Sequence, residues 1–141
     1  MFPYPSVVEA IRLWASERGD VHALAIVGSH ARGTATGHSD IDVVILATNP
    51  AVFRTQGTWL RQIPWPLGMT PCSEGRDREY GALWSRHLFL RDGTPLELSF
   101  GSAEWARTDP VDPGTRNVVQ GGCQVVWDPA GLLAALQAAV A

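Results

Sequence analysis

The sequence has few of the features that mark membrane or disulfide-stabilised proteins. No stretch approaches the roughly 20 consecutive apolar residues that a membrane-spanning helix needs, and residues 1–5 lack the basic start and apolar centre of a secretory signal. There are only two cysteines, Cys72 and Cys123, which lie far apart and have no metal-type spacing. We therefore expect a cytoplasmic protein with reduced cysteines.

Positive charge is not in excess either. The 11 basic and 14 acidic side chains give a net charge of −3, which argues against a protein that grips long nucleic acid by counterion release. A chain of 141 residues, 45% of them hydrophobic, fits one compact domain over residues 1–141. Small substrates fit this composition better than long nucleic acids do.

Two common nucleotide-binding motifs are also missing. The chain has no Gly-Lys-Ser/Thr ending of a P-loop, and no Gly-x-Gly-x-x-Gly follows its first apolar run. Neither a P-loop fold nor a dinucleotide-binding fold is therefore expected.

Residues 28–42 carry the most informative pattern. Gly28 and Ser29 follow the apolar run 23–27, so the backbone can turn sharply into a short helical segment whose free N–H groups can face an anion. Asp40 and Asp42 open a second apolar run, and side-chain alternation places both on one face of a strand, opposite Ile41. Neighbouring carboxylates repel each other unless a cation lies between them. Magnesium is a cation that prefers such oxygen ligands.

Apolar periodicity and turn residues predict an α+β fold with a small mixed β-sheet and flanking helices. Ser6 is expected to cap the first helix, and the Asp92-Gly93 pair to form a hairpin turn. Residues 67–80 look irregular, with a possible short strand over 69–73. We expect helices over 6–18, 50–62, 113–120 and from 128 onward, a short helical piece over 102–107, and strands over 23–28, 40–47, 83–90, 95–100 and 123–127.

Residues 28–33 (Gly-Ser-His-Ala-Arg-Gly) followed by residues 39–42 (Ser-Asp-Ile-Asp) resemble the nucleotidyltransferase superfamily of DNA polymerase β-like enzymes. The resemblance is greatest to small single-domain bacterial members related to antibiotic and minimal nucleotidyltransferases, and a weaker one extends over residues 109–131. It implies a polymerase β palm-like fold. It also implies that the turn at Gly28 and Ser29 binds the β- and γ-phosphates of a nucleoside triphosphate, while Asp40 and Asp42 carry the metal, with two Mg²⁺ ions expected.

The resemblance further implies a third carboxylate on a later strand, for which Glu97 is the candidate. Leu96 and Leu98 flank it, so its side chain is expected on the opposite face of the strand. In the family this acid takes the proton from the attacking hydroxyl. Relatives of this type often have another acid two residues later, where this chain has Ser99. If that second position is the catalytic one, the chain has lost its base.

Two residues of the same region have open roles. Arg32 contributes either to triphosphate binding or to an ion pair beneath the turn. Ser39 is a further candidate for nucleotide binding, or it only caps the approach to the second strand.

Several other side chains are of interest. His30 and His38 flank the expected site, whereas His22 and His87 are expected outside it. The tryptophans are expected to pack in the core, with one of them available to stack on a nucleobase or a flat acceptor. Trp65 is the least suited to the core because it lies between prolines. A modest basic group, consisting of Arg76, Arg78 and Arg86, is expected near the acceptor side. Such groups are more often solvated surface than phosphate or acceptor sites.

The function expected from this resemblance is the transfer of AMP from ATP to a hydroxyl of a small molecule or a partner protein. The alternative is a catalytically weak or inactive nucleotide-binding regulator, such as the antitoxin half of a toxin–antitoxin pair. Larger relatives use an extra helical domain to shape the acceptor site, and this chain has almost no room for one. The acceptor surface is therefore expected to come from residues 64–80, from a second copy in a homodimer, or from a partner chain.

Overall fold

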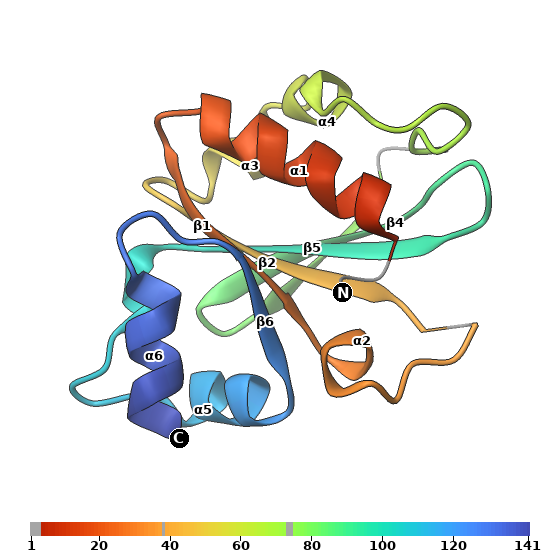
Figure 1. Cartoon of the computed structure of the whole chain (residues 1–141). Coiled ribbons are helices and arrows are strands. Elements are labelled where there is room, and N and C mark those ends of the chain that lie inside the picture. Colours follow the sequence, from red (N-terminus) through yellow and green to blue (C-terminus); the bar gives the residue numbers. More distant parts are fainter. Residues whose placement is uncertain (1–3, 38, 73–74) are drawn as a thin grey trace.

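The computed structural model describes residues 4–37, 39–72 and 75–141, and these form an α+β fold around one six-stranded sheet (Figure 1). The strand order is β3-β4-β5-β2-β1-β6; β2 and β5 are parallel, and the other neighbours are antiparallel. The expected mixed sheet is confirmed. The elements are α1 (Pro5–Glu17), β1 (Val21–Val27), α2 (Ser29–Arg32), β2 (Ile41–Ala47), α3 (Val52–Thr55), α4 (Trp59–Gln62), β3 (Arg76–Tyr80), β4 (Leu83–Phe89), β5 (Pro95–Gly101), the 3₁₀ helix η1 (Ala103–Ala106), α5 (Pro113–Gln120), β6 (Cys123–Trp127) and α6 (Leu132–Val140).

Helices cover both faces of the sheet, but unequally. Helices α1, α3 and α4 lie on one face, and α5 and α6 lie on the other, beside β1 and β6 (Figure 1). Each face has its own hydrophobic core. Alternation along β2 directs Ile41 and Val43 into the core under α1 and Val44 into the core under α5 and α6. Within the described residues, no helix has both the length and the apolar character needed to cross a bilayer.

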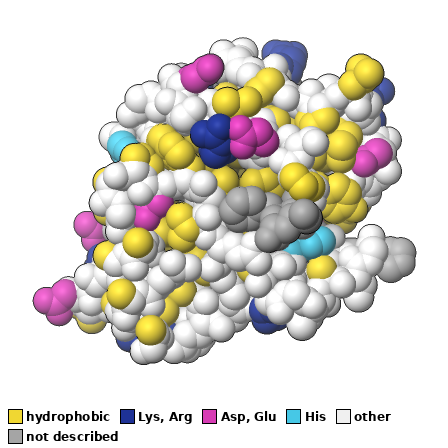
Figure 2. Space-filling model, in the orientation of Figure 1, with side chains coloured by type: hydrophobic (Ala, Val, Ile, Leu, Met, Phe, Trp, Pro, Cys, Tyr) yellow, Lys and Arg dark blue, Asp and Glu magenta, His cyan; other side chains and the backbone are white. Residues whose placement is uncertain are grey.

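Helix α1 forms because apolar residues recur at helical spacing and bury one face against the sheet. Its buried residues are Val7, Val8, Ala10, Ile11, Trp14 and Ala15. The prediction that Ser6 caps this helix is wrong, because the helix already begins at Pro5. The fixed φ of proline suits the first helical position, which places Ser6 inside the first turn. In the space-filling view, charged side chains are scattered over the face that carries α1 (Figure 2).

The single helix expected over residues 50–62 is wrong. The chain forms two short helices, α3 and α4, with Gly57 between them. This break lets both Phe53 and Trp59 enter the core, where the Trp59 indole N–H donates to the Phe53 carbonyl at 2.7 Å. Glycine also lowers helix propensity at this point.

The sequence analysis missed strand β3. All five of its residues are exposed, and the first four alternate between basic and acidic side chains instead of apolar and polar ones. Its antiparallel pairing with β4 makes it the edge strand of the sheet. The short strand expected over 69–73 is reduced to an isolated bridge between Pro71 and Leu90, and Ser73 lies outside the described residues.

The C-terminal half follows the expected order. The Asp112 carboxylate caps α5 by accepting the Thr115 N–H at 3.1 Å. The last helix begins at Leu132, later than expected. Asp128 lies before it and accepts the N–H groups of Leu133 and Ala134 at 3.2 and 3.0 Å.

Candidate functional site

Four adjacent strands align their polar side chains in one row across the sheet. Asp42 on β2 lies opposite Glu97 on β5, Glu97 lies opposite His87 on β4, and His87 lies opposite Arg76 on β3. Residues directly opposite each other in a sheet project from the same face. The row is therefore on the face of the sheet opposite α1. Helices α5 and α6 pack on this same face, but over β1 and β6, beside the row.

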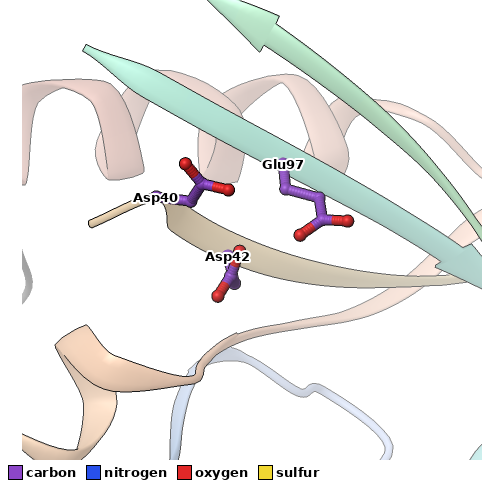
Figure 3. A group of neighbouring side chains, drawn as sticks. All are labelled: Asp40, Asp42 and Glu97. Carbon is purple, nitrogen blue, oxygen red and sulfur yellow. The ribbon is translucent and has the colours of Figure 1, made fainter. Parts of the chain in front are cut away.

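Asp40, Asp42 and Glu97 form an acidic cluster. Each offers a carboxylate oxygen, and these three oxygens lie within 4.8 Å of one another (Figure 3). Leu96 and Leu98 are fully buried on the opposite face, which turns Glu97 toward the aspartates as expected. The strand register thus brings together three residues that are far apart in the sequence.

Ser99 does not occupy an equivalent place. It lies opposite Val44, two residues further along β5, and its hydroxyl is 2.7 Å from the Ser85 hydroxyl. Glu97 is the residue of β5 that aligns with Asp42.

Burial and repulsion act together on Asp42. Partial burial, a hydrogen bond with Glu97 and the charges of Glu97 and Asp40 raise the pKa of Asp42 to about 8, against a weaker opposing effect of Arg32. Its Oδ1 is buried and has no hydrogen-bond partner among the described residues. Three convergent carboxylate oxygens are the ligands that a hard divalent cation such as Mg²⁺ prefers. The residues present therefore fit a metal site.

The turn after β1 is pressed against this cluster. Gly28 has φ +78°, and a Cβ at this position would lie 2.4 Å from Asp42 Oδ2. Glycine is required here for two reasons: residues with a side chain avoid this backbone conformation, and any Cβ would collide with the Asp42 carboxylate. Ser29 then begins α2, so the turn that the sequence singles out adjoins the acids directly.

Helix α2 is fixed in place from the opposite end of the sequence. Arg32 donates to the Gly121 carbonyl at 3.1 Å and to the Thr34 hydroxyl at 3.3 Å, and the Gln124 side chain donates to the Ala31 carbonyl at 3.3 Å. From the sequence alone, Arg32 is expected either to bind the triphosphate or to form an ion pair beneath the turn. In the structure it forms no ion pair with any described carboxylate.

Ser39 shapes the segment that leads into β2. Its hydroxyl accepts the Thr36 N–H at 2.9 Å, and its carbonyl lies 3.3 Å from His30 Nε2. These bonds order the turn immediately before Asp40. His38 lies outside the described residues.

The expectation that His87 lies outside the site is wrong. Its Nε2 is 3.2 Å from Asp40 Oδ2, and both side chains are about one-third exposed. The β4–β5 hairpin brings His87 opposite Glu97, which carries its ring to the acidic cluster. A two-residue loop at Asp92-Gly93 would pair Leu88 with Glu97, so the turn predicted from the sequence does not give this contact. In the structure the loop is longer, with the Leu90 N–H donating to the Thr94 carbonyl at 2.9 Å, and this register brings His87 opposite Glu97.

A cavity of about 330 Å³ opens beside the acids. The structure divides the expected basic group, because Arg86 is on the other face of the sheet, where it donates to both Asp77 oxygens at 2.8 and 3.1 Å. Tyr80 is an addition that the sequence analysis missed. The lining residues are Asp40, Arg76, Arg78, Tyr80, His87 and Glu97.

A larger cavity of about 560 Å³ lies elsewhere, between α4 and residues 63–72. Trp65 lines it, packs against the core beneath α1 and donates its indole N–H to the Leu60 carbonyl at 2.9 Å. The described residues that line it include no aspartate or glutamate. Residues 64–80 therefore contribute to two separate cavities, and Trp65 is not at the acidic one.

Comparison with known proteins agrees with this geometry. Residues 8–93 match a family model described as a nucleotidyltransferase domain, and this range includes Gly28, Asp40, Asp42 and His87. Glu97 lies just beyond it and is placed by the structure alone. A search of curated proteins found no match. Because the family match covers more than half of the chain, the protein belongs to the nucleotidyltransferase domain family.

Proposed function

We propose that this protein transfers AMP from ATP to a hydroxyl group of a small molecule or a partner protein in a metal-dependent reaction. The observation that carries the proposal is the convergence of Asp40, Asp42 and Glu97 within 4.8 Å beside the Gly28 turn. Membership of the nucleotidyltransferase family supports the reaction class.

Asp40, Asp42 and Glu97 would hold Mg²⁺, two ions by family resemblance, and bound metal would offset negative charge on the phosphates and on the attacking and leaving oxygens. The unpaired Oδ1 and the raised pKa of Asp42 support this assignment, because a bound cation would contact the unpaired oxygen and reduce the repulsion among the three carboxylates.

The chain's own residues would then act in defined ways. Glu97 accepts the proton of the acceptor hydroxyl as its oxygen forms a bond to the α-phosphorus. The bond from the α-phosphorus to the bridging oxygen breaks, and pyrophosphate leaves on the side of Gly28 and Ser29, whose backbone N–H groups hold it. Arg32, exposed and anchored on Gly121, adds positive charge on that side, and Ser39 keeps the turn before Asp40 in order.

The test is transfer of label from [α-³²P]ATP, with Mg²⁺, to a panel of hydroxyl compounds and candidate partner proteins. We expect labelled acceptor with the wild type, none with Asp40→Asn, and nearly unchanged transfer with Ser99→Ala, which alters the same face without touching the acids. ATP binding that never leads to transfer would count against the enzyme and in favour of the regulator.

A further inference from the structure

Strand β3 separates its charges between the two faces of the sheet. Alternation places Asp77 and Glu79 on one face and Arg76, Arg78 and Tyr80 on the other. The two acids are neutralised on their own face: Asp77 accepts from Arg86, and Glu79 accepts from Arg54 at 2.7 Å. The two arginines face the acidic cavity instead.

Neither of these two arginines forms an ion pair among the described residues, because neither Arg76 nor Arg78 has a carboxylate of those residues within 4.0 Å. The charge of Glu97 acts on Arg78 from beyond ion-pair distance. Arg78 donates to the Tyr80 hydroxyl at 3.3 Å. Guanidinium groups favour bidentate contacts with phosphate oxygens, and two neighbouring ones on an exposed strand can hold one such group.

The cavity is therefore polarised from end to end. The acids on β2 and β5 form one end, and the arginines on β3 form the other, with His87 on β4 between them. Two strand spacings separate β5 from β3, which is roughly 10 Å. A volume of about 330 Å³ suits a small molecule of this length.

The position of Gly28 decides which substrate meets the arginines. The Gly28 turn follows β1, on one side of Asp42, whereas β5, β4 and β3 extend from the other side. An in-line displacement needs the attacking oxygen and the leaving pyrophosphate on opposite sides of the α-phosphorus. With pyrophosphate at Gly28, the acceptor enters from the side of β4 and β3.

We propose that Arg76 and Arg78 form an anion subsite that selects a phosphate-bearing hydroxyl compound as acceptor. The identification of the bound compound as the acceptor rests on the proposed transferase function, whereas the anion subsite itself rests on the charges of β3. The acceptor hydroxyl lies toward Glu97, its phosphate lies between the two guanidinium groups, and the exposed ring of Tyr80 provides a flat side wall. Two arginines oppose a cationic acceptor in the same place.

Direct binding tests the subsite without any need for turnover. Matched ligands are glucose, glucuronate and glucose 6-phosphate, which differ only at carbon 6, and binding is followed by calorimetry and by amide NMR shifts. We expect glucose 6-phosphate to bind at least about tenfold more tightly than glucose, with shifts over residues 76–80. Glucuronate should bind less tightly than glucose 6-phosphate, and the reverse order would overturn the choice of phosphate.

A matched pair of double variants isolates the arginines. R76A/R78A removes two cavity charges, and R12A/R107A removes two exposed arginines that pair with Glu9 and Glu104 elsewhere. We expect R76A/R78A to weaken glucose 6-phosphate binding at least about tenfold and R12A/R107A to leave it unchanged. Equal losses in both variants, equal binding of glucose and glucose 6-phosphate, or shifts confined to residues 28–32 would overturn the proposal.

Turnover separates this inference from the proposed function. We expect labelled AMP on glucose 6-phosphate in preference to glucose, and a KM that rises in R76A/R78A for the sugar phosphate but not for ATP. A matching rise for ATP would mean that the arginines hold the nucleotide, which overturns the acceptor assignment. Arginine-dependent phosphate binding with no transfer to any acceptor would contradict the enzyme while supporting the anion subsite.

Discussion

Replacing Asp42 with asparagine tests whether the carboxylates of the acidic cluster repel one another unless a metal ion neutralises them. Asparagine keeps the shape of the side chain but removes its charge and its titration. In the wild type, burial and the hydrogen bond and charge of Glu97 raise the pKa of Asp42 from 3.8 to about 8. The folded protein therefore binds a proton more tightly than the unfolded chain does.

The sign of the effect on stability follows from this shift. Between about pH 4 and pH 8, the unfolded chain loses the Asp42 proton more readily than the folded chain, so the free energy of unfolding falls as pH rises. Each pKa unit corresponds to about 1.4 kcal/mol, which gives an upper limit of about 4 kcal/mol at pH 7. Asp42 is partly exposed, so solvent screening lowers the expected loss to roughly 2 kcal/mol.

Urea unfolding at pH 5, 6, 7 and 8 measures this loss through the fluorescence of the buried tryptophans, including Trp14, Trp59 and Trp84. In EDTA, the wild type should lose roughly 2 kcal/mol relative to Asp42→Asn between the lowest and highest pH. Millimolar Mg²⁺ should restore the wild type at pH 8 and have little effect on the variant. Parallel pH profiles of the two proteins, or an equal effect of Mg²⁺ on both, would refute the reasoning.

Three further substitutions test the surroundings of Asp42. Gly28→Ala should lower the free energy of unfolding in urea by roughly 1–3 kcal/mol more than Gly33→Ala does, because both glycines have positive φ but only Gly28 is near Asp42; similar losses would mean that Asp42 yields easily. Glu97→Gln should weaken Mn²⁺ binding, followed by electron paramagnetic resonance, at least about tenfold and slow AMP transfer by roughly 10²–10⁴-fold, while Ser99→Ala changes neither; metal binding that survives Glu97→Gln would remove Glu97 from the ligand set. His87→Ala should weaken Mn²⁺ binding roughly tenfold by releasing Asp40, and His87→Gln should recover part of the loss; unchanged affinity in both variants would show that Asp40 needs no support.

The site's acidic part was predictable because its signals are local. Asp40 and Asp42 are separated by one residue, and alternation along an apolar strand is enough to place them on one face. The orientation of Glu97 also followed from Leu96 and Leu98. What alternation cannot provide is register, and the placement of Glu97 opposite Asp42 depends on the parallel pairing of β5 with β2.

The parts that were missed depend on long-range pairing or lack an apolar signal. Strand β3 has no hydrophobic face that could reveal it in the sequence. Its acidic residues are instead stabilised by ion pairs with Arg86 on β4 and Arg54 on α3. The break between α3 and α4 reflects the burial of Phe53 and Trp59 together, which overrides the helical spacing of residues 50–62. The place of His87 also depends on register, because a two-residue loop at Asp92-Gly93 would bring Leu88 opposite Glu97.

Strand direction explains why these groups meet at one edge of the sheet. The chain leaves β1 at Gly28 and enters β2 just after Asp40, and the parallel partner β5 begins at the same edge, two residues before Glu97. Because β4 runs antiparallel to β5, it reaches this edge near its end, at His87, and β3 starts there with Arg76. A slip of one residue in β5 would turn Glu97 into the core and expose Leu96 and Leu98. The apolar residues that stabilise the fold therefore also set the register on which the acidic cluster depends.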